Sequence, residues 1–329
     1  MTSLQDAGRI GWQRYGISNS GAMDRLALAA ANALVGNPPS AAGVEFVLLG
    51  GSFAVEGGSA RLALAGAPFG LTLDGDRVPS HVSVTLRPGQ ILTLSPPVAG
   101  VYAVLAAAGG FDVPTALGSQ SLHPRARLGG LDGRPLREGD RIPFVLPQAP
   151  DGPEFRLPPL PLEPEAAIRV VLGPQADHFA DAAIAAFLSA TYRVSQEADR
   201  MGYRLNGPRI PHARGFNIVS DGIATGSVQV PGSGEPIVLM ADRQTAGGYP
   251  KIATVISADH RVLAQRRPGD PVRFAALEVE AAQPLARERA ALAASLPTRV
   301  ASVLRAAWSP EDLLRLNLAG EAVNAFGGR

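Results

Sequence analysis

Short apolar runs that alternate with polar residues or are rich in β-branched residues recur along the chain. Glycine, proline or aspartate flanks most of them, a pattern typical of short β-strands between turns. The runs are Val44–Leu49, Arg61–Ala65, Val82–Leu86, Ile91–Leu94, Val101–Ala106, Arg141–Leu146, Ile168–Leu172, Ser227–Val230, Ile237–Met240, Ala253–Ile256 and Pro271–Phe274. Many short strands with few helices predict a mainly β fold of barrels or sandwiches, and not a βαβ fold.

Helical periodicity is confined to three parts of the chain. Asp24–Val35 is rich in alanine and leucine and is followed by a glycine. Gln175–Leu188 carries apolar residues at helical spacing. We also expect a helical tail after Pro284, where Ser309-Pro310 supplies an N-cap and a first-turn proline.

A proline-rich segment, residues 147–165, divides the chain near its middle and favours a semi-rigid connector. The two sides resemble diverged copies. Ala-Gly-Gly-Phe at 108–111 is echoed by Ala-Gly-Gly-Tyr at 246–249, and Gly-Asp pairs at 139–140 and 269–270 each precede a candidate strand. Although such short turn motifs are common, two matches in the same order favour an internal duplication. We expect a first domain at 1–150, a linker at 151–165, a second domain at 166–283 and a helical tail at 284–329.

The composition describes a globular protein. Hydrophobic residues make up 46% of the chain and charged residues 18%, and the net charge is +1. Since no basic stripe alternates with aromatic residues, nucleic acid is not an expected partner. No apolar run has the length of a membrane span, and the N-terminus lacks the features of a signal peptide. We therefore expect a cytoplasmic protein with no membrane partner.

Several familiar kinds of site are excluded. The absence of cysteine removes disulfides, thiolate metal sites and a cysteine nucleophile. The five histidines show no metal-ligand spacing, so no metal site is predicted. The sequence also contains neither a P-loop nor a nucleophile elbow.

Lys251 is the only lysine in a chain with 30 Lys+Arg. Lysine is a compact, titratable point charge, whereas arginine is a planar fork that stays protonated. A site that needs a small cation, or an amine that can lose its proton, would resist replacement by arginine. The simpler explanation is that one lysine remains by chance in a chain biased toward arginine. The residues around Lys251 therefore have to decide whether it is functional.

Three polar clusters could carry chemistry. The first contains Asp6, Arg9, Asp24, Asn32 and Glu45. The second is Asp199–Arg204 with Ser220-Asp221-Gly222. The third is Gln229 with Asp242–Lys251, whose glycines would let backbone amides approach a ligand closely.

Each cluster also has a structural explanation. Asp24 precedes a helix and suits an N-cap, and Asp6 with Arg9 could be a turn ion pair of little energetic value. Asn32 and Glu45 lie in apolar segments and need partners if they are buried. The two arginines of the second cluster could form a solvated face or a fork for a carboxylate or phosphate.

The order of these motifs resembles one protein family over nearly the whole chain. The motifs are Thr2–Asp6, Gly8-Arg9, Ser20–Asp24, Ala31–Asn37, Gly109–Phe111, Gly118-Ser119, Gly129-Gly130, Asp199–Leu205, Gln229–Pro231, Leu239–Lys251, Gln265, Pro268–Asp270 and Asn317-Leu318 with Gly320. On them the sequence is identified as a member of the family of 5-oxoprolinase C subunits, also described as the Kip-antagonist or allophanate-hydrolase-subunit-2 type. That family is similar to the carboxyltransferase part of biotin-dependent urea carboxylase.

The resemblance implies two tandem cyclophilin-like β-barrel domains. It also implies an obligate partner of the Kip-inhibitor type, which is the B-type protein of the complex, with the active site shared between the two proteins. A third, A-type protein completes the assembly. Members with separate subunits resemble parts of an ATP-dependent 5-oxoprolinase. In such a complex ATP is a co-substrate that phosphorylates the lactam at its carbonyl oxygen, and hydrolysis yields glutamate. Biotin is not expected on this chain, because Lys251 is not in a biotin-carrier context.

We therefore expect a hydrolase subunit that is inactive alone. Lys251 and Arg204 would neutralise a phosphate or the substrate carboxylate, and Asp242, Gln244 and Gln229 would orient the lactam amide. Other expected contacts with a small amide or lactam substrate are Arg200, Thr245, Gly247, Gly248, Tyr249, Asp6, Arg9, Asp24, Asn32 and Glu45. This hypothesis requires Lys251 and Arg204 to meet in one solvent-reachable groove between the two halves.

Two alternative functions stay open on the sequence. The first is the carboxyltransferase component of a urea or amide carboxylase, with carboxybiotin supplied by another protein. The second is a non-enzymatic regulator that binds a kinase-inhibitor-type partner. Neighbouring genes would separate the enzymes, because a biotin-carboxylase frame favours the first alternative and a frame for the A-type protein favours oxoprolinase.

Overall fold

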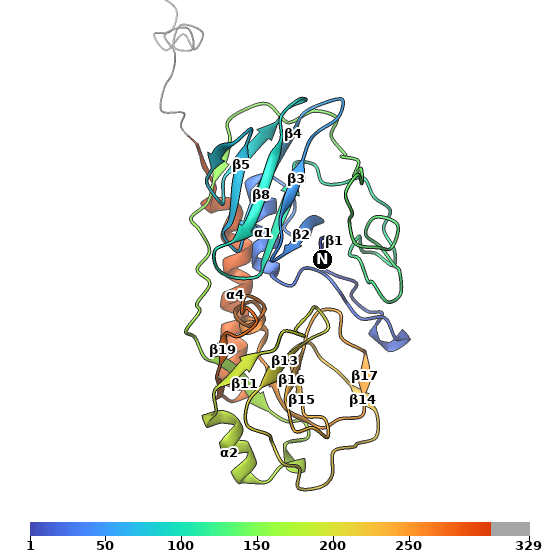
Figure 1. Cartoon of the computed structure of the whole chain (residues 1–329), viewed down its shortest axis with the longest axis vertical. Coiled ribbons are helices and arrows are strands. Elements are labelled where there is room, and N and C mark those ends of the chain that lie inside the picture. Colours follow the sequence, from blue (N-terminus) through green and yellow to red (C-terminus); the bar gives the residue numbers. More distant parts are fainter. Residues whose placement is uncertain (304–329) are drawn as a thin grey trace, which may run out of the picture.

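The computed structural model describes residues 1–303, which form two β-rich halves beside a long C-terminal helix (Figure 1). The prediction of a mainly β fold with few helices is confirmed. Within these residues no helix is long and apolar enough to cross a bilayer.

Two antiparallel sheets build the first half. The larger sheet has the order β1 (Ser3–Gln5), β2 (Gly43–Val47), β9 (Tyr102–Ala107), β4 (Ala60–Gly66) and β7 (Ser83–Leu86). The smaller has the order β3 (Gly51–Phe53), β8 (Leu92–Pro97), β5 (Phe69–Leu73) and β6 (Asp76–Val78). Phe46, Leu64 and Leu92 belong to one buried apolar cluster that draws side chains from both sheets. The two sheets therefore form a sandwich around this cluster.

Helix α1 (Arg25–Leu34) covers the other face of the larger sheet. Asp24 caps it, since its Oδ1 accepts a hydrogen bond of 2.9 Å from the backbone N–H of Ala27. Every residue of α1 after Arg25 is buried. The helix is rich in alanine, which favours helix and leaves little side-chain bulk between it and the sheet.

An eight-stranded sheet builds the second half. Its order is β19 (Pro271–Val272), β12 (Tyr192–Val194), β13 (Gly202–Asn206), β16 (Ile237–Leu239), β15 (Ser227–Gln229), β18 (Lys251–Val255), β11 (Ile168–Leu172) and β20 (Phe274–Ala276). The first and last strands of this order are separated in sequence by Arg273 alone. The sheet must therefore curl until its two ends nearly meet, which makes an almost closed barrel. Val228, Val238 and Ile252 lie fully buried in its core.

Small elements surround this barrel. They are η2 (Ala176–His178), α2 (Asp181–Ser189), η3 (Ser257–Asp259), α3 (His260–Ala264) and the paired strands β14 (Asp221–Gly222) and β17 (Ala246–Gly247). A further short helix, η1 (Gln13–Tyr15), belongs to a loop of the first half that reaches this region, where Gln13 Nε2 donates to the carbonyl of Ile223 over 2.7 Å.

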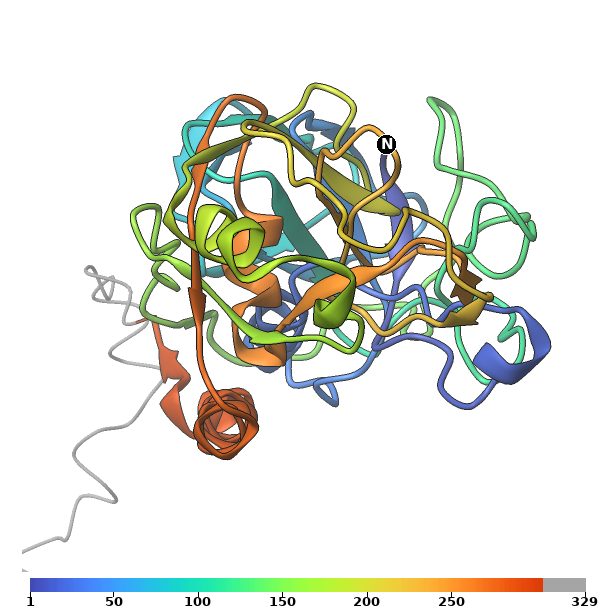
Figure 2. The ribbon, with the colours of Figure 1, turned by 90° about the horizontal axis from the view of Figure 1, so that it is seen from below.

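The long helix α4 (Val279–Arg299) runs beside both halves and lies at an edge of the ribbon in Figure 2. It contacts α1 of the first half and η3 of the second. Beyond it, β21 (Ala301–Ser302) pairs with β10 (Phe155–Arg156) in the proline-rich connector. The predicted domain limits remain predictions, but the connector and α4 both tie the halves together.

Several predicted elements were wrong in detail. Arg141–Leu146 forms no strand, and only Phe144 makes an isolated bridge, to Phe111. The predicted helix at Gln175–Leu188 is interrupted, because η2 ends at His178 and α2 begins at Asp181. The C-terminal helix begins at Val279, before Pro284. The predicted N-cap at Ser309 lies outside the described residues.

Candidate functional site

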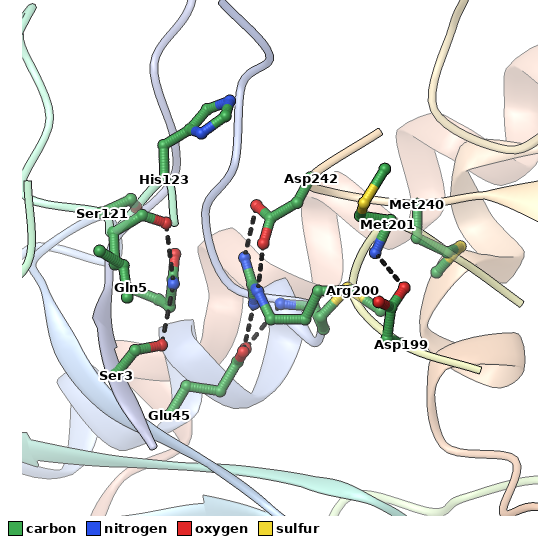
Figure 3. Close-up of polar contacts among 12 residues, drawn as sticks. Ser3, Gln5, Glu45, Ser121, His123, Asp199, Arg200, Met201, Met240 and Asp242 are labelled. Atoms are coloured by element: carbon green, nitrogen blue, oxygen red, sulfur yellow. Dashed lines mark hydrogen bonds and ion pairs between the residues drawn. The ribbon is translucent and has the colours of Figure 1, made fainter. Parts of the chain in front are cut away.

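A buried arginine, Arg200, joins the two halves. It lies just before β13, and its guanidinium donates hydrogen bonds to carboxylates from both halves (Figure 3). Nη1 donates to Glu45 of β2, while Nε and Nη2 reach the two oxygens of Asp242 at 2.8 and 3.1 Å. Nη2 also donates to the carbonyl of Gly21 over 2.8 Å. The fork geometry of arginine suits this bidentate contact.

This triad is almost completely shielded from solvent. The side chains of Glu45, Arg200 and Asp242 are 0%, 5% and 5% exposed. Burial opposes the charge of Arg200, but Asp242 and Glu45 outweigh it and raise the pKa of the guanidinium. Burial raises the pKa of Glu45, and Arg200 and the N–H of Met23 act against that shift. Removing one member of such a network leaves an uncompensated charge in the interior.

A second network crosses the same junction. Asp24, which caps α1, uses its Oδ2 to accept from Arg261 Nε at 2.9 Å and from Gln265 Nε2 at 2.7 Å. Gln265 Oε1 accepts from the backbone N–H groups of Val101 and Tyr102 at 2.8 and 3.0 Å, and its Nε2 donates to the Tyr102 carbonyl at 2.8 Å. Gln265 therefore satisfies backbone groups of the first half from a position in the second.

A cavity of about 340 Å³ lies beside the Arg200 triad. Residues from both halves line it, among them Tyr102, His123, Arg200, Tyr203 and Asp242. Burial raises the pKa of Tyr102 and of Tyr203, so both phenols stay protonated. The Tyr203 hydroxyl donates a hydrogen bond of 2.6 Å to the carbonyl of Ala264. The cavity thus combines apolar walls with one buried ionic patch, a combination common in small-molecule sites.

A serine–histidine contact near this cavity does not have the polarity of a nucleophile–base pair. Ser18 Oγ lies 2.9 Å from His123 Nε2. His123 Nδ1 accepts a hydrogen bond from the N–H of Ala126, which places the proton of the neutral ring on Nε2. Burial lowers the pKa of His123, which favours this neutral form. The ring therefore donates to Ser18 and cannot remove its proton.

Lys251 is the first residue of β18, and its side chain reaches the small β14–β17 ribbon. Its Nζ donates to Asp221 Oδ2 at 2.6 Å and to the carbonyl of Gly222 at 3.1 Å. Gln175 Nε2 also donates to Asp221 Oδ2, at 3.1 Å. The side chain of Lys251 is 1% exposed, whereas that of Asp221 is 50% exposed. Hydrogen bonds from Lys251 and Gln175 lower the pKa of Asp221. The amine is thus one side chain away from solvent.

Three predicted residues lie close to this lysine. Gln229 is its register partner on β15, and Gln229 Oε1 accepts from Gln244 Nε2 at 3.4 Å. Gly247 pairs with Asp221 across the ribbon, and a side chain at Gly247 would come within 2.8 Å of Gln229 Nε2. The structure therefore brings these residues together, and the glycine leaves room beside the two amides.

Thr245, Gly248 and Tyr249 lie in the same loop and contribute backbone groups. The carbonyls of Thr245 and Gly248 accept from Ile223 and Ile218 at 3.0 and 2.8 Å. The carbonyl of Tyr249 accepts from Gln229 Nε2 at 3.4 Å.

Arg204 does not meet Lys251. Its Nε lies 3.4 Å from the carboxylate of Glu197, and both of these side chains are exposed. Strands β16 and β15 lie between β13, which carries Arg204, and β18, which carries Lys251. The expected shared groove is therefore not formed. Of the two arginines in this motif, Arg200 is the one that joins the halves.

The remaining predicted residues make structural contacts. Asp6 accepts from the N–H groups of Gly8 and Gln120, both at 2.7 Å, and from Ser119 Oγ at 2.7 Å. Arg9 is fully buried and donates to the carbonyl of Ala116 at 2.9 Å. No ion pair links Asp6 to Arg9 in the described part of the chain. Asn32 donates to the carbonyl of Ala41 at 2.8 Å, so this polar residue of an apolar helix has the partner that burial demands.

Sequence reasoning missed several residues of this junction as site residues. Tyr102, His123 and Arg261 were not singled out, and Asp221 was named without its partner. The phenol of Tyr102 in an otherwise apolar run was an available signal, because a buried polar tip needs a partner. No comparable signal marked Arg261 in an arginine-rich chain. Within residues 1–303 no cluster of three potential metal ligands is found.

Comparison with known proteins gives a consistent result. The family model of the carboxyltransferase domain, subdomain A and B, matches residues 15–276. The chain is 39% identical to the 5-oxoprolinase C subunit of Haemophilus influenzae and 40% identical to that of Escherichia coli. The alignments cover 87% and 85% of this chain and 91% and 90% of the relatives.

A solved structure agrees with these matches. The Kluyveromyces lactis urea carboxylase superposes with a TM-score of 0.82 at 27% identity, over 90% of this chain. The matched region is 28% of that much longer protein.

Proposed function

Because this chain belongs to the carboxyltransferase domain (subdomain A and B) family, we propose that it is a subunit of an ATP-dependent 5-oxoprolinase. The observation that carries the proposal is the match to two proteins named as 5-oxoprolinase C subunits, at 39% and 40% identity and over about nine-tenths of their length. The complex would also contain a B-type protein, which shares the active site, and an A-type protein. This chain alone would be inactive.

In the proposed reaction ATP transfers its terminal phosphoryl group to the carbonyl oxygen of the lactam. Water then adds to the activated carbon, and the ring C–N bond breaks with a proton going to nitrogen, which leaves an acyl phosphate. A second water hydrolyses this acyl phosphate to the side-chain carboxylate and inorganic phosphate. The products are glutamate, ADP and phosphate. Negative charge on the phosphoryl group and on the substrate carboxylate needs cationic or hydrogen-bond donors in a site from which water is excluded.

Lys251 is the strongest candidate for such a cation in this chain. Its Nζ is bonded to Asp221 and to the carbonyl of Gly222, so an anion that displaces the half-exposed Asp221 carboxylate would meet a preorganised amine. The amides of Gln229 and Gln244 lie beside it and offer both donors and acceptors for a lactam. The Arg200 cavity would bind apolar parts of a ligand or the B-type partner.

The decisive assay is 5-oxoproline-dependent release of ADP by the complex reconstituted with the A-type and B-type proteins. We expect Lys251→Met to lower kcat about 100-fold, the usual magnitude for removing one donor to developing charge. Arg204→Met is the matched control, because Arg204 pairs with Glu197 at the surface. Loss of activity in Arg204→Met but not in Lys251→Met would contradict the role of Lys251. No 5-oxoproline-dependent ADP release from the wild-type complex would contradict the proposed function.

A second candidate is the carboxyltransferase step of a biotin-dependent carboxylase. It is favoured by the superposition on urea carboxylase, which extends over 90% of this chain. Its test is transfer of the carboxyl group to urea from carboxybiotin supplied on a separate carrier. Activity blocked by avidin would select this function over lactam hydrolysis.

A further inference from the structure

A second cavity, of about 250 Å³, lies where α1, α3 and α4 approach one another. Its lining includes Arg25 at the start of α1, Arg261 of α3 and Arg289 of α4. Ser20, Thr225 and His260 add polar groups, and no aspartate or glutamate is among the described residues of the lining. Ala241 lines this cavity while Asp242 lines the cavity beside Arg200, so the two cavities are separate neighbours.

Two buried polar groups of this lining lack partners within residues 1–303. Ser20 is 2% exposed, and its Oγ makes no hydrogen bond there. Arg261 is 5% exposed, and although Nε and Nη1 are bonded to Asp24 and to the carbonyl of Pro161, Nη2 has no partner. Buried polar groups in folded proteins are rarely left without a partner, so these two groups are available to a bound ligand or water.

The positive charge of this cavity is only partly neutralised. Arg261 is paired with Asp24, and Arg289 lies 3.8 Å from Glu163. Arg25 makes no hydrogen bond or ion pair with the described residues and is exposed at the cavity mouth. The guanidinium of Arg25 is thus free to meet a ligand that enters from solvent, and that of Arg261 has an N–H group without a partner among the described residues.

We infer that this cavity is an oxyanion-binding site, for a phosphate group or a carboxylate. Guanidinium groups bind either anion through paired N–H donors, and hydrogen bonds to a charged partner are stronger than neutral ones. A water molecule occupies about 30 Å³ in the liquid, so the cavity has room for an anion of several heavy atoms with some water. Arg25, Arg261 and the Ser20 hydroxyl supply the donors.

The position of this site gives an anion a structural consequence. Ser20 and Arg25 belong to the first half, Arg261 belongs to the second, and Arg289 belongs to α4. An anion bound among them bridges all three parts and stabilises the folded protein by mass action. The inference does not depend on the proposed reaction, because it concerns binding by this chain alone.

The test is titration of the purified full chain with inorganic phosphate and, separately, with acetate, at constant ionic strength. Isothermal calorimetry measures affinity, and the thermal midpoint gives an independent reading. We expect saturable binding of at least one anion, weakened at least about tenfold by Arg25→Gln. Arg77→Gln, another exposed arginine that lies outside this lining, is the matched control and keeps wild-type affinity.

Ser20→Ala supplies a second measurement. Its hydroxyl has no partner, so removing it leaves the midpoint without anion unchanged or higher and weakens anion binding. Binding of phosphate alone assigns a phosphoryl ligand, and binding of acetate alone assigns a carboxylate. The inference is overturned if neither anion binds saturably, or if Arg25→Gln binds as tightly as wild type. Neither result would bear on the ADP-release assay of the complex.

Discussion

Arg200 shows how much one side chain contributes to the junction between the halves. In the buried triad, its guanidinium is the one positive charge beside the two carboxylates of Glu45 and Asp242. The interior tolerates two carboxylates there because the arginine hydrogen-bonds both of them. This dependence makes the triad a sensitive place to test the energetics of the fold.

We predict that Arg200→Met lowers the free energy of unfolding by about 3–5 kcal/mol, since it leaves two buried carboxylates without a counter-charge. Adding Glu45→Gln removes one orphaned charge and should recover part of the loss. Urea denaturation of the wild type, of Arg200→Met, of Glu45→Gln and of the double variant measures these effects. If the costs of the two substitutions simply add, the residues are not coupled as described.

His81 gives a prediction on pH. Burial and the nearby Arg261 lower the pKa of His81 to about 4, below the ordinary value of 6.5. The unfolded chain therefore takes up this proton first as pH falls, so the stability contribution is complete above pH 6.5 and is lost toward pH 4. We expect the wild type to lose about 2 kcal/mol more than His81→Asn between pH 7 and pH 5.

Asparagine suits this test because His81 has a positive φ of 60° and asparagine tolerates that conformation. Urea unfolding at the two pH values gives the comparison. If the free energy of unfolding falls equally in both proteins between pH 7 and pH 5, a group other than His81 controls the pH dependence. His260 titrates in both proteins and so cancels from the difference.

The sequence identified many residues of the junction but not their contacts. Asp24 was named with its capping role as one explanation, and Arg200, Glu45 and Asp242 were named as candidates. However, Arg200 and Glu45 are 155 residues apart, and Arg200 and Asp242 are 42 apart. Such pairs are set by how the two halves pack, which no local pattern reports. The pairing of Lys251 with Arg204 was inferred from charge and spacing, and the sheet order separates them.

At the level of elements, α1 is held between a sheet and α4. Leu296 of α4 is 2% exposed and belongs to the same apolar cluster as Leu26 and Leu34 of α1. The outer surface of α4 is polar, so this contact is what holds the helix in place.

We predict that Leu296→Ala lowers the free energy of unfolding by about 2–5 kcal/mol, through lost burial and the cavity it leaves. Glu288→Ala, at an exposed position of the same helix, should change it by less than about 0.5 kcal/mol. Chemical denaturation monitored by circular dichroism measures both. Equal effects of the two substitutions would mean that α4 does not depend on this contact.

Elements with strong local signals were predicted well, and weak ones were not. Asp24–Val35 was expected to be helical, and α1 spans Arg25–Leu34 because an N-cap, alanines and a following glycine all agree. Arg141–Leu146 has the alternation of a strand but no neighbouring strand to complete a ladder. Pro271–Phe274 was read as one strand, but the chain there leaves one end of the barrel sheet and enters the other. Alternation reports an extended backbone and not its partner.

On the scale of the whole molecule, each half carries buried polar groups whose hydrogen-bond partners lie in the other half. Gln265 makes four hydrogen bonds across the junction, to the two N–H groups and one carbonyl around Val101 and Tyr102 and to Asp24. The Arg200 triad, the Asp24 network and α4 lie along the same boundary. The barrel core also takes in Val101 and Tyr102 of the first half. We therefore expect the wild-type protein to unfold in one cooperative transition.

Gln265→Ala should break this coupling. Without the amide, the N–H groups of Val101 and Tyr102 stay buried without their acceptor, at a cost of about 1–3 kcal/mol for each unsatisfied group. Val101 and Tyr102 are the first-half residues that enter the barrel core, so the penalty falls where the two halves meet. Calorimetry should then resolve two transitions, or one broadened transition whose van't Hoff enthalpy falls below the calorimetric enthalpy. A single sharp transition at the wild-type midpoint would mean that the halves are coupled by α4 and the connector, and not through Gln265.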